Sequence, residues 1–142
     1  MSQKVIPYLL YEDVGAAIDW LGEAFGFREE LRYAEPDGRI SHAEVRVGDA
    51  SIMLGGPGAG YQNPRHTGHF SQLVVVQVED ADAHYERAKA AGATILAEPA
   101  DQAYGDRSYR VEDPEGHHWS FHHPIAAPTP EEWGAQRAQP GA

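Results

Sequence analysis

A chain of 142 residues, 42% of them hydrophobic, is long enough to form one compact domain with its own core. It contains no cysteine, which excludes a disulfide framework, a thiolate metal site and a cysteine nucleophile. Its formal net charge of −11 argues against nucleic-acid binding, because that function relies on Lys and Arg side chains that neutralise phosphates. An acidic protein can still attract cationic small molecules.

The first half of the chain predicts a strand, a helix and three further strands. The apolar strand spans residues 5–11, and Asp13 follows as a helix N-cap. Apolar residues at helical spacing continue to Phe25, and Gly26 ends the helix. Strands are expected at 29–35, 40–47 and 50–54. In the second of these, His42 and Glu44 alternate with apolar residues and therefore share a face.

Residues 55–68 are rich in glycine and form a linker. Gly55 and Gly60 have the separation of a phosphate-binding loop, but Tyr61-Gln62 stands where such a loop requires Lys followed by Ser or Thr. Phosphate binding is therefore not expected there.

The second half predicts the same order of elements. A strand at 71–78 leads to a helix that is capped by Asp80 and ends at Gly92. Strands are expected at 94–97, 107–112 and 117–123, with a loop over 98–105. The last residues are rich in Pro, Ala and Gly, which predicts a poorly ordered tail with one turn at 131–133.

The two halves repeat at a spacing of 67 residues. Glu12-Asp13 corresponds to Glu79-Asp80, and Ser41 corresponds to Ser108. We therefore expect two βαβββ modules in one structural domain, at 1–56 and 69–123, with a linker at 57–68 and a flexible tail at 124–142. The predicted class is α+β, with the helices covering the outer face of each sheet. The other faces form an incompletely closed, eight-stranded, barrel-like cleft.

This order of elements, together with the segment from Tyr104 to Phe121 and its Asp113-Pro-Glu-Gly116 turn, resembles the vicinal oxygen chelate superfamily. That superfamily includes glyoxalase I, extradiol dioxygenases and bleomycin-resistance proteins. The segment Ile6–Asp13 resembles the bleomycin-resistance branch in particular. The resemblance covers about residues 4–123. It implies a homodimer, in which modules of different chains often complete each cleft.

The resemblance also implies a divalent metal, with ligands from the first and last strand of each module. The corresponding residues here are Ile6, Met53, Leu73 and Ser120. None of them is a good ligand for a hard divalent metal, and shifting the alignment by one residue would add only Gln72. We therefore expect no metal and no cofactor.

Several polar and aromatic residues are candidates for the cleft. His42, with Glu44 beside it, suits a base or a hydrogen-bond donor, and Tyr104 lies in a loop near the cleft mouth. His118 and Ser120 share a face of the last strand. The histidines at 117, 118, 122 and 123 are interpreted as surface residues at the strand end. Ser120 lacks the strand–turn–helix setting of a nucleophile elbow, so no Ser-His-Asp triad is predicted.

Two functions follow as hypotheses. The first is a metal-free protein that binds an aromatic or cationic small molecule through His42, Glu44, Tyr104, His118 and Ser120. The alternative is a divalent-metal-dependent lyase, isomerase or dioxygenase with displaced ligands. No stretch of the sequence approaches 18 apolar residues, and residues 1–7 lack the apolar region of a signal peptide. A cytoplasmic protein without nucleic-acid or membrane partners is expected.

Overall fold

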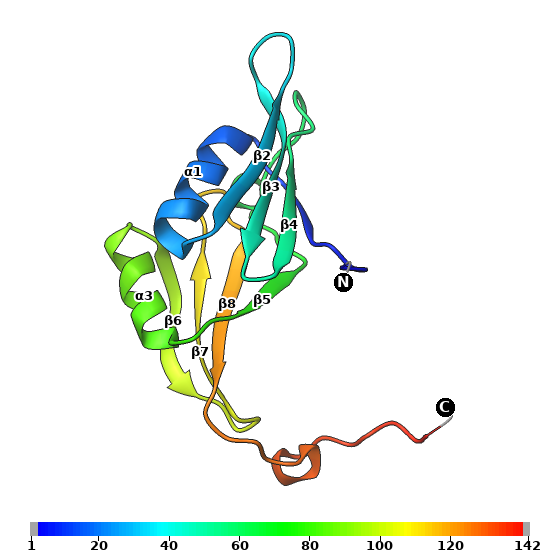
Figure 1. The fold of residues 1–142 in the computed structure, drawn as a ribbon, viewed down its shortest axis with the longest axis vertical. Helices are drawn as coiled ribbons and strands as arrows, with labels where there is room; N and C mark the ends of the chain where they lie inside the picture. Colours follow the sequence, from blue (N-terminus) through cyan, green and yellow to red (C-terminus); the bar gives the residue numbers. More distant parts are fainter. Residues whose placement is uncertain (1–2, 141–142) are drawn as a thin grey trace.

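The structure, a computed structural model, describes residues 3–140 and contains two modules of like topology (Figure 1). Each module has a four-stranded sheet, and the strand orders are β1-β4-β3-β2 and β5-β8-β7-β6. In each sheet the first strand pairs in parallel with the last, and the remaining pairs are antiparallel. The predicted α+β class with two βαβββ modules is confirmed, and the two sheets remain separate without closing into a barrel.

The first module consists of β1 (Tyr8–Leu10), α1 (Val14–Phe25), β2 (Arg28–Ala34), β3 (Ile40–Val47) and β4 (Ala50–Gly55). Helix α1 begins after Asp13, the predicted N-cap, whose side chain accepts a hydrogen bond from the Ala16 amide. It ends at Gly26, whose φ of 77° is a left-handed conformation that glycine adopts without strain.

The linker contains the short helix α2 (Pro64–Thr67). The second module follows with β5 (Leu73–Gln77), α3 (Ala81–Ala90), β6 (Thr94–Asp101), β7 (Asp106–Glu112) and β8 (His118–Pro124). The Asp80 side chain caps α3 as Asp13 caps α1. A single 3₁₀ turn, η1 (Pro130–Trp133), lies in the C-terminal segment, close to the one turn expected there.

The core lies between the helices and the sheets, and both helices cover the same side of the molecule (Figure 1). Phe25, the last residue of α1, packs edge-on against Trp119 and Phe121 of the second module, with ring centroids 5.6 and 4.7 Å away. His84 of α3 bonds the Phe25 carbonyl through Nε2 at 3.0 Å. The hydrophobic core is therefore continuous across the two modules.

A buried carboxylate also joins the modules. Asp113 is 1% exposed and accepts hydrogen bonds from the Tyr11 hydroxyl at 2.7 Å and from Trp119 Nε1 at 3.2 Å. The amides of Glu115 and His117 donate to its other oxygen. Burial and the negative charge of Asp113 raise the pKa of the Tyr11 hydroxyl well above its ordinary value. The Asp-Pro-Glu-Gly turn thus anchors the first module as well as shaping its own hairpin.

Three sequence predictions need correction. Strand β6 extends to Asp101, although 98–105 was expected to be a loop because of Pro99. The edge position of β6 and its register shifts between Ile95 and Ala100 accommodate that proline. Helix α2 was not predicted, although Asn63 caps it and Pro64 starts it as those residue types usually do.

The third correction concerns the internal repeat. Gly55 and His122, which are 67 residues apart, occupy equivalent places on β4 and β8. Their partners across the ladder, His42 and Ser108, are 66 residues apart. The structural counterpart of Ser108 is therefore His42, whereas the sequence alignment had matched it to Ser41. The longer turn between β7 and β8 causes this shift of one residue.

Candidate functional site

The sheet faces opposite the helices carry the candidate residues. On β3, Ala43 and Val45 are buried in the core, so His42 and Glu44 point to the other face, as the alternating pattern predicts. In the antiparallel register Tyr33 lies opposite His42, and Leu31 lies opposite Glu44. Tyr33 is 56% exposed and Leu31 is 45% exposed. A polar pair therefore lies within a largely uncovered apolar face.

His42 lies at the centre of a hydrogen-bonded group on this first face. Its Nε2 lies 3.0 Å from Oε2 of Glu44, and its Nδ1 lies 3.0 Å from the hydroxyl of Tyr8. A carboxylate only accepts, so Nε2 carries a proton, and in the neutral imidazole Nδ1 accepts from the phenol. The Tyr8 ring reaches His42 across Gly55, where an added Cβ would lie 2.4 Å from the ring. Glycine at this position leaves the space that the ring occupies.

A second hydrogen-bonded group lies on the face of the second sheet. His122 Nδ1 is 3.0 Å from Oδ2 of Asp106, and its Nε2 is 2.7 Å from Oγ of Ser120. His122 and Ser120 are 7% and 6% exposed, respectively. The Tyr104 ring stacks on the His122 ring at 6.1 Å between centroids.

Tyr104 and Ser120 line one cavity of about 230 Å³, which also has Glu98, Gln102 and Arg110 in its wall. His118, two residues before Ser120 on β8, lies apart from this cavity against Phe70, with ring centroids 3.7 Å apart. The structure thus brings His42 together with Glu44, and Tyr104 together with Ser120. The two pairs belong to different modules.

Equivalent positions of the two faces carry opposite charges. In the strand ladders Glu44 lies opposite Met53, and Arg110 lies opposite Ser120, so Glu44 and Arg110 are counterparts. Arg46 lies opposite Ser51, and Glu112 lies opposite His118, so those two are counterparts as well. At these two pairs of positions an acidic residue in one module therefore corresponds to a basic residue in the other.

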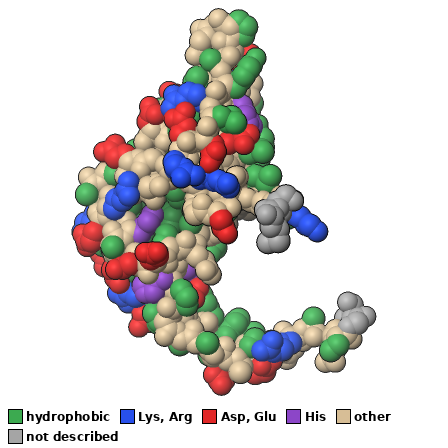
Figure 2. Space-filling model, in the orientation of Figure 1, with side chains coloured by type: hydrophobic (Ala, Val, Ile, Leu, Met, Phe, Trp, Pro, Cys, Tyr) green, Lys and Arg blue, Asp and Glu red, His purple; other side chains and the backbone are tan. Residues whose placement is uncertain are grey.

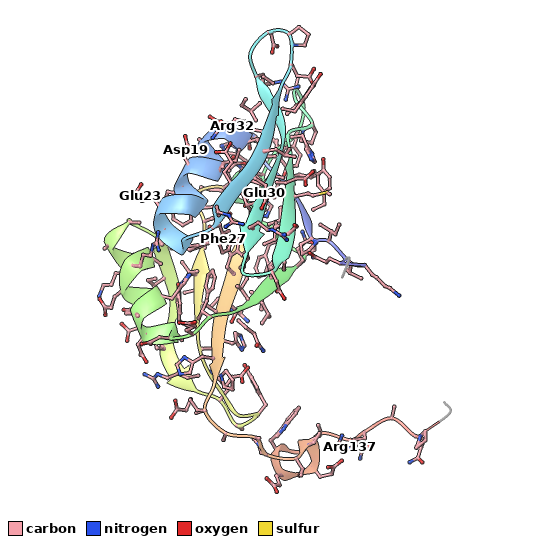
Figure 3. The ribbon with its side chains drawn as sticks, in the orientation of Figure 1. Asp19, Glu23, Phe27, Glu30, Arg32 and Arg137 are labelled. Atoms are coloured by element: carbon pink, nitrogen blue, oxygen red, sulfur yellow. The ribbon has the colours of Figure 1, made fainter. Side chains whose placement is uncertain are left out.

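The outer surface around the helices differs from these faces in its charge distribution. Figure 2 shows acidic and basic side chains intermingled over that part of the molecule. Asp19 of α1 lies beside Arg32 of β2 (Figure 3), and Arg32 bonds it at 3.1 Å while also bonding Glu29. Such exposed ion pairs contribute little to stability and suggest a solvated surface.

The residues at the expected metal positions do not fit a hard divalent cation. Ile6 and Leu73 offer hydrocarbon, Met53 a thioether, and Ser120 a hydroxyl already bonded to His122. Within residues 3–140, no group of three or more His, Cys, Asp or Glu side chains is arranged to hold a metal ion.

The prediction that the histidines at 117, 118, 122 and 123 lie at the surface needs correction. His117 and His122 are buried, and His117 Nε2 bonds the Leu10 carbonyl of the first module at 2.7 Å.

Some contacts of the site were not predictable from the sequence pattern. Nothing in that pattern joins Ser120 to His122 and Asp106, yet the three side chains are hydrogen-bonded in a row. Asp106 lies 16 residues from His122, so only the register of β7 and β8 could have revealed the contact. Tyr8 was likewise not predicted as a site residue. Its neighbour Leu9 is buried in the core, so Tyr8 points to the opposite side of the first sheet, which we call the open face because no helix covers it.

Comparison with known proteins identifies the class. The sequence profile of the Glyoxalase/Bleomycin resistance protein/Dioxygenase superfamily matches residues 6–121. The chain belongs to this superfamily.

Individual proteins are also similar to the chain in sequence or in structure. The chain is 36% identical over 124 residues to the uncharacterised Mycobacterium bovis protein Mb0911c, covering 84% of this chain and 82% of that protein. It is 37% identical to TioX from Micromonospora sp. ML1, with a TM-score of 0.72 over 87% of this chain and 100% of TioX. The fosfomycin resistance protein FosX of Listeria monocytogenes, solved with Mn(II) and sulfate, is 18% identical, with a TM-score of 0.65 over 94% of this chain and 95% of FosX. That last likeness concerns the fold alone.

Among the residues that the structure describes, no helix has the length and apolar character that crossing a bilayer requires.

Proposed function

We propose that this chain binds an aromatic or cationic small molecule, without a metal, between the open face of a first module and that of a second. The observation that carries the proposal is the hydrogen-bonded pair His42 and Glu44 within an exposed apolar and aromatic face. Ligand sites typically combine apolar walls with a few fixed polar groups. Tyr104 supplies a ring for stacking, and Glu44 supplies the charge that attracts a cation.

A homodimer is part of this proposal. In the single chain Tyr8, Tyr33 and Val75 are each 48–56% exposed on the open faces, which is apolar surface that a second copy would cover. The opposite charges of Glu44 and Arg110 suit a cleft in which the first module of one chain meets the second module of its partner. We place the protein in the cytoplasm as part of the same proposal.

The test begins with a thermal-shift screen of aromatic and cationic compounds, followed by titration calorimetry of the hit. Tyr104→Ala should weaken binding about tenfold if roughly 1.4 kcal/mol of stacking is lost. Glu44→Gln should weaken cationic ligands more than neutral ones, and less so at high salt. Glu23→Gln on the outer side of α1 (Figure 3) is the matched control and should bind as the wild type does.

Two outcomes would contradict the proposal. If Tyr104→Ala and Glu44→Gln both bind as tightly as the wild type, the ligand lies elsewhere. If elemental analysis finds about one zinc, manganese, nickel or iron per chain, and cleft substitutions remove it, the metal-dependent alternative replaces the metal-free one.

A further inference from the structure

The row Asp106–His122–Ser120 has a fixed direction of proton donation. Asp106 Oδ2 accepts only, so the bond of 3.0 Å to His122 Nδ1 places the imidazole proton on Nδ1. In the neutral imidazole His122 Nε2 is then a lone pair, and the Ser120 hydroxyl 2.7 Å away donates to it. The other neighbour of Ser120 Oγ is the Tyr109 carbonyl at 3.4 Å, which also accepts only and is the weaker partner.

This arrangement is the one that activates a serine. A nucleophilic hydroxyl needs a base within about 2.6–3.2 Å, and the base needs a third group that holds its orientation. Ser120, His122 and Asp106 meet both requirements, and the low exposure of His122 keeps the imidazole in one position. The three residues come from two neighbouring strands, so the rigid ladder of β7 and β8 supports the geometry.

The cavity beside Ser120 offers room for a reacting group and a cation near it. Arg110 lies opposite Ser120 in the strand ladder and lines the same cavity of about 230 Å³. Within the described part of the chain Arg110 takes part in no ion pair. A guanidinium without a carboxylate partner can stabilise negative charge that develops on a carbonyl oxygen.

We propose that Ser120 is a catalytic nucleophile toward carboxylic esters. Its Oγ forms a bond to the ester carbonyl carbon while its proton passes to His122 Nε2. The bond from that carbon to the alkoxy oxygen then breaks, and His122 gives the proton to the departing alcohol. Water then forms a bond to the acyl carbon while its proton passes to His122 Nε2. The bond from that carbon to Ser120 Oγ breaks, His122 returns the proton to Oγ, and the acid is released. Asp106 is the positioning residue that keeps the imidazole in the reactive tautomer.

This inference goes beyond the proposed function, because a protein that only binds its ligand would satisfy that function without any reactive serine. The two can also fail separately. Ser120→Ala can lose ester hydrolysis while the Tyr104 and Glu44 sides of the cleft still bind a ligand. Conversely, Tyr104→Ala and Glu44→Gln can lose ligand binding while Ser120 still hydrolyses esters.

The first experiment treats the full chain with a fluorophosphonate probe and with p-nitrophenyl acetate, followed by intact-mass analysis and peptide mapping. We expect a single label on Ser120, and loss of labelling and of ester hydrolysis in Ser120→Ala and His122→Gln. Ser41→Ala is the matched control, because Ser41 is a part-buried serine of the first module whose hydroxyl bonds Glu35 and no histidine, and it should label as the wild type does. No label on the folded wild type, or equal loss in Ser41→Ala, would overturn the proposal.

The second experiment stays informative even if Ser120→Ala does not fold. The chain has no cysteine, so Ser120→Cys introduces a single thiol whose reaction with iodoacetamide can be followed directly. With His122 as its base, this thiol should react at least about tenfold faster at neutral pH than the thiol of Ser41→Cys, at a part-buried position whose side chain bonds no histidine. Equal rates would contradict an activated position at 120.

The positioning role of Asp106 has its own readout. In Asp106→Asn the amide group can donate to Nδ1, which moves the imidazole proton to Nε2 and prevents Ser120 from donating there. Nitrogen-detected NMR should show this change of tautomer at His122, together with a loss of labelling of at least about tenfold. An unchanged tautomer with unchanged labelling would remove Asp106 from the mechanism.

Discussion

At the scale of single residues, polar side chains without access to bulk water hold the two modules together. Asp113 accepts from four donors, one of which is the Tyr11 hydroxyl of the other module. A buried acceptor that loses a donor is costly, because water cannot replace it. On the open face of the second sheet, His122 and Ser120 follow the same rule because they satisfy each other.

The Tyr11 hydroxyl should make stability depend on alkaline pH. Because its pKa is raised in the folded protein, the unfolded chain loses that proton first, and stability falls as pH rises above about 10. Tyr109, whose pKa burial also raises, acts in the same direction. Tyr11→Phe should cost about 1–2 kcal/mol at pH 8 and should flatten the decline between pH 10 and 11.5.

Urea unfolding at several pH values measures both effects. Tyr33→Phe is the control, because Tyr33 is 56% exposed and has no side-chain hydrogen bond within residues 3–140. An equally steep alkaline decline in Tyr11→Phe would show that the Tyr11–Asp113 bond does not contribute to the pH dependence.

At the scale of elements, a side chain of α3 binds the C-terminal end of α1. Arg87 of α3 donates to the carbonyl oxygens of Glu23 and Gly22 at 2.9 and 3.0 Å, which satisfies acceptors at the C-terminal end of α1. A cation is also favourable at that end of a helix. Arg87→Ala should lower the free energy of unfolding by about 1 kcal/mol.

Hydrogen exchange should localise that effect to the last turn of α1. Glu86→Ala, at the adjacent exposed position of α3, controls for the change in helix propensity and should leave α1 protection unchanged. If Arg87→Ala leaves α1 protection unchanged as well, the two carbonyl bonds are not stabilising in solution.

The elements themselves were largely predictable because their signals are local. Asp13, Asp80 and Gly26 mark helix ends by chemistry that acts over three or four residues, and β3 was predicted with its observed bounds from alternation alone. The candidate site was harder, because the Asp106–His122 and Tyr8–His42 contacts join different strands. A register shift of one residue between the modules, caused by the longer turn between β7 and β8, changes which side chains correspond.

At the scale of the whole molecule, a single chain leaves both open sheet faces uncovered. The proposed homodimer predicts twice the chain mass of 15.6 kDa by light scattering after size exclusion at micromolar concentration. Glu44→Lys should weaken the dimer by placing a cation near Arg110 of the other subunit, and adding Arg110→Glu should restore part of the affinity. Glu23→Lys on the helix side is the control for net charge.

A monomer at all concentrations would contradict the dimer. Dissociation by Glu44→Lys without any recovery in the double variant would show that the two positions do not meet. The ester chemistry of Ser120 depends on neither result, since its three residues lie within one sheet.

The inverted charges of the two sheet faces have a consequence for how such a chain can descend from a duplicated half. A protein made of two first modules would carry Glu44 twice in its cleft, and one made of two second modules would carry Arg110 twice. Neither would combine the opposite charges that Glu44 and Arg110 bring to the present chain. At these positions the two modules are complementary, and neither can replace the other.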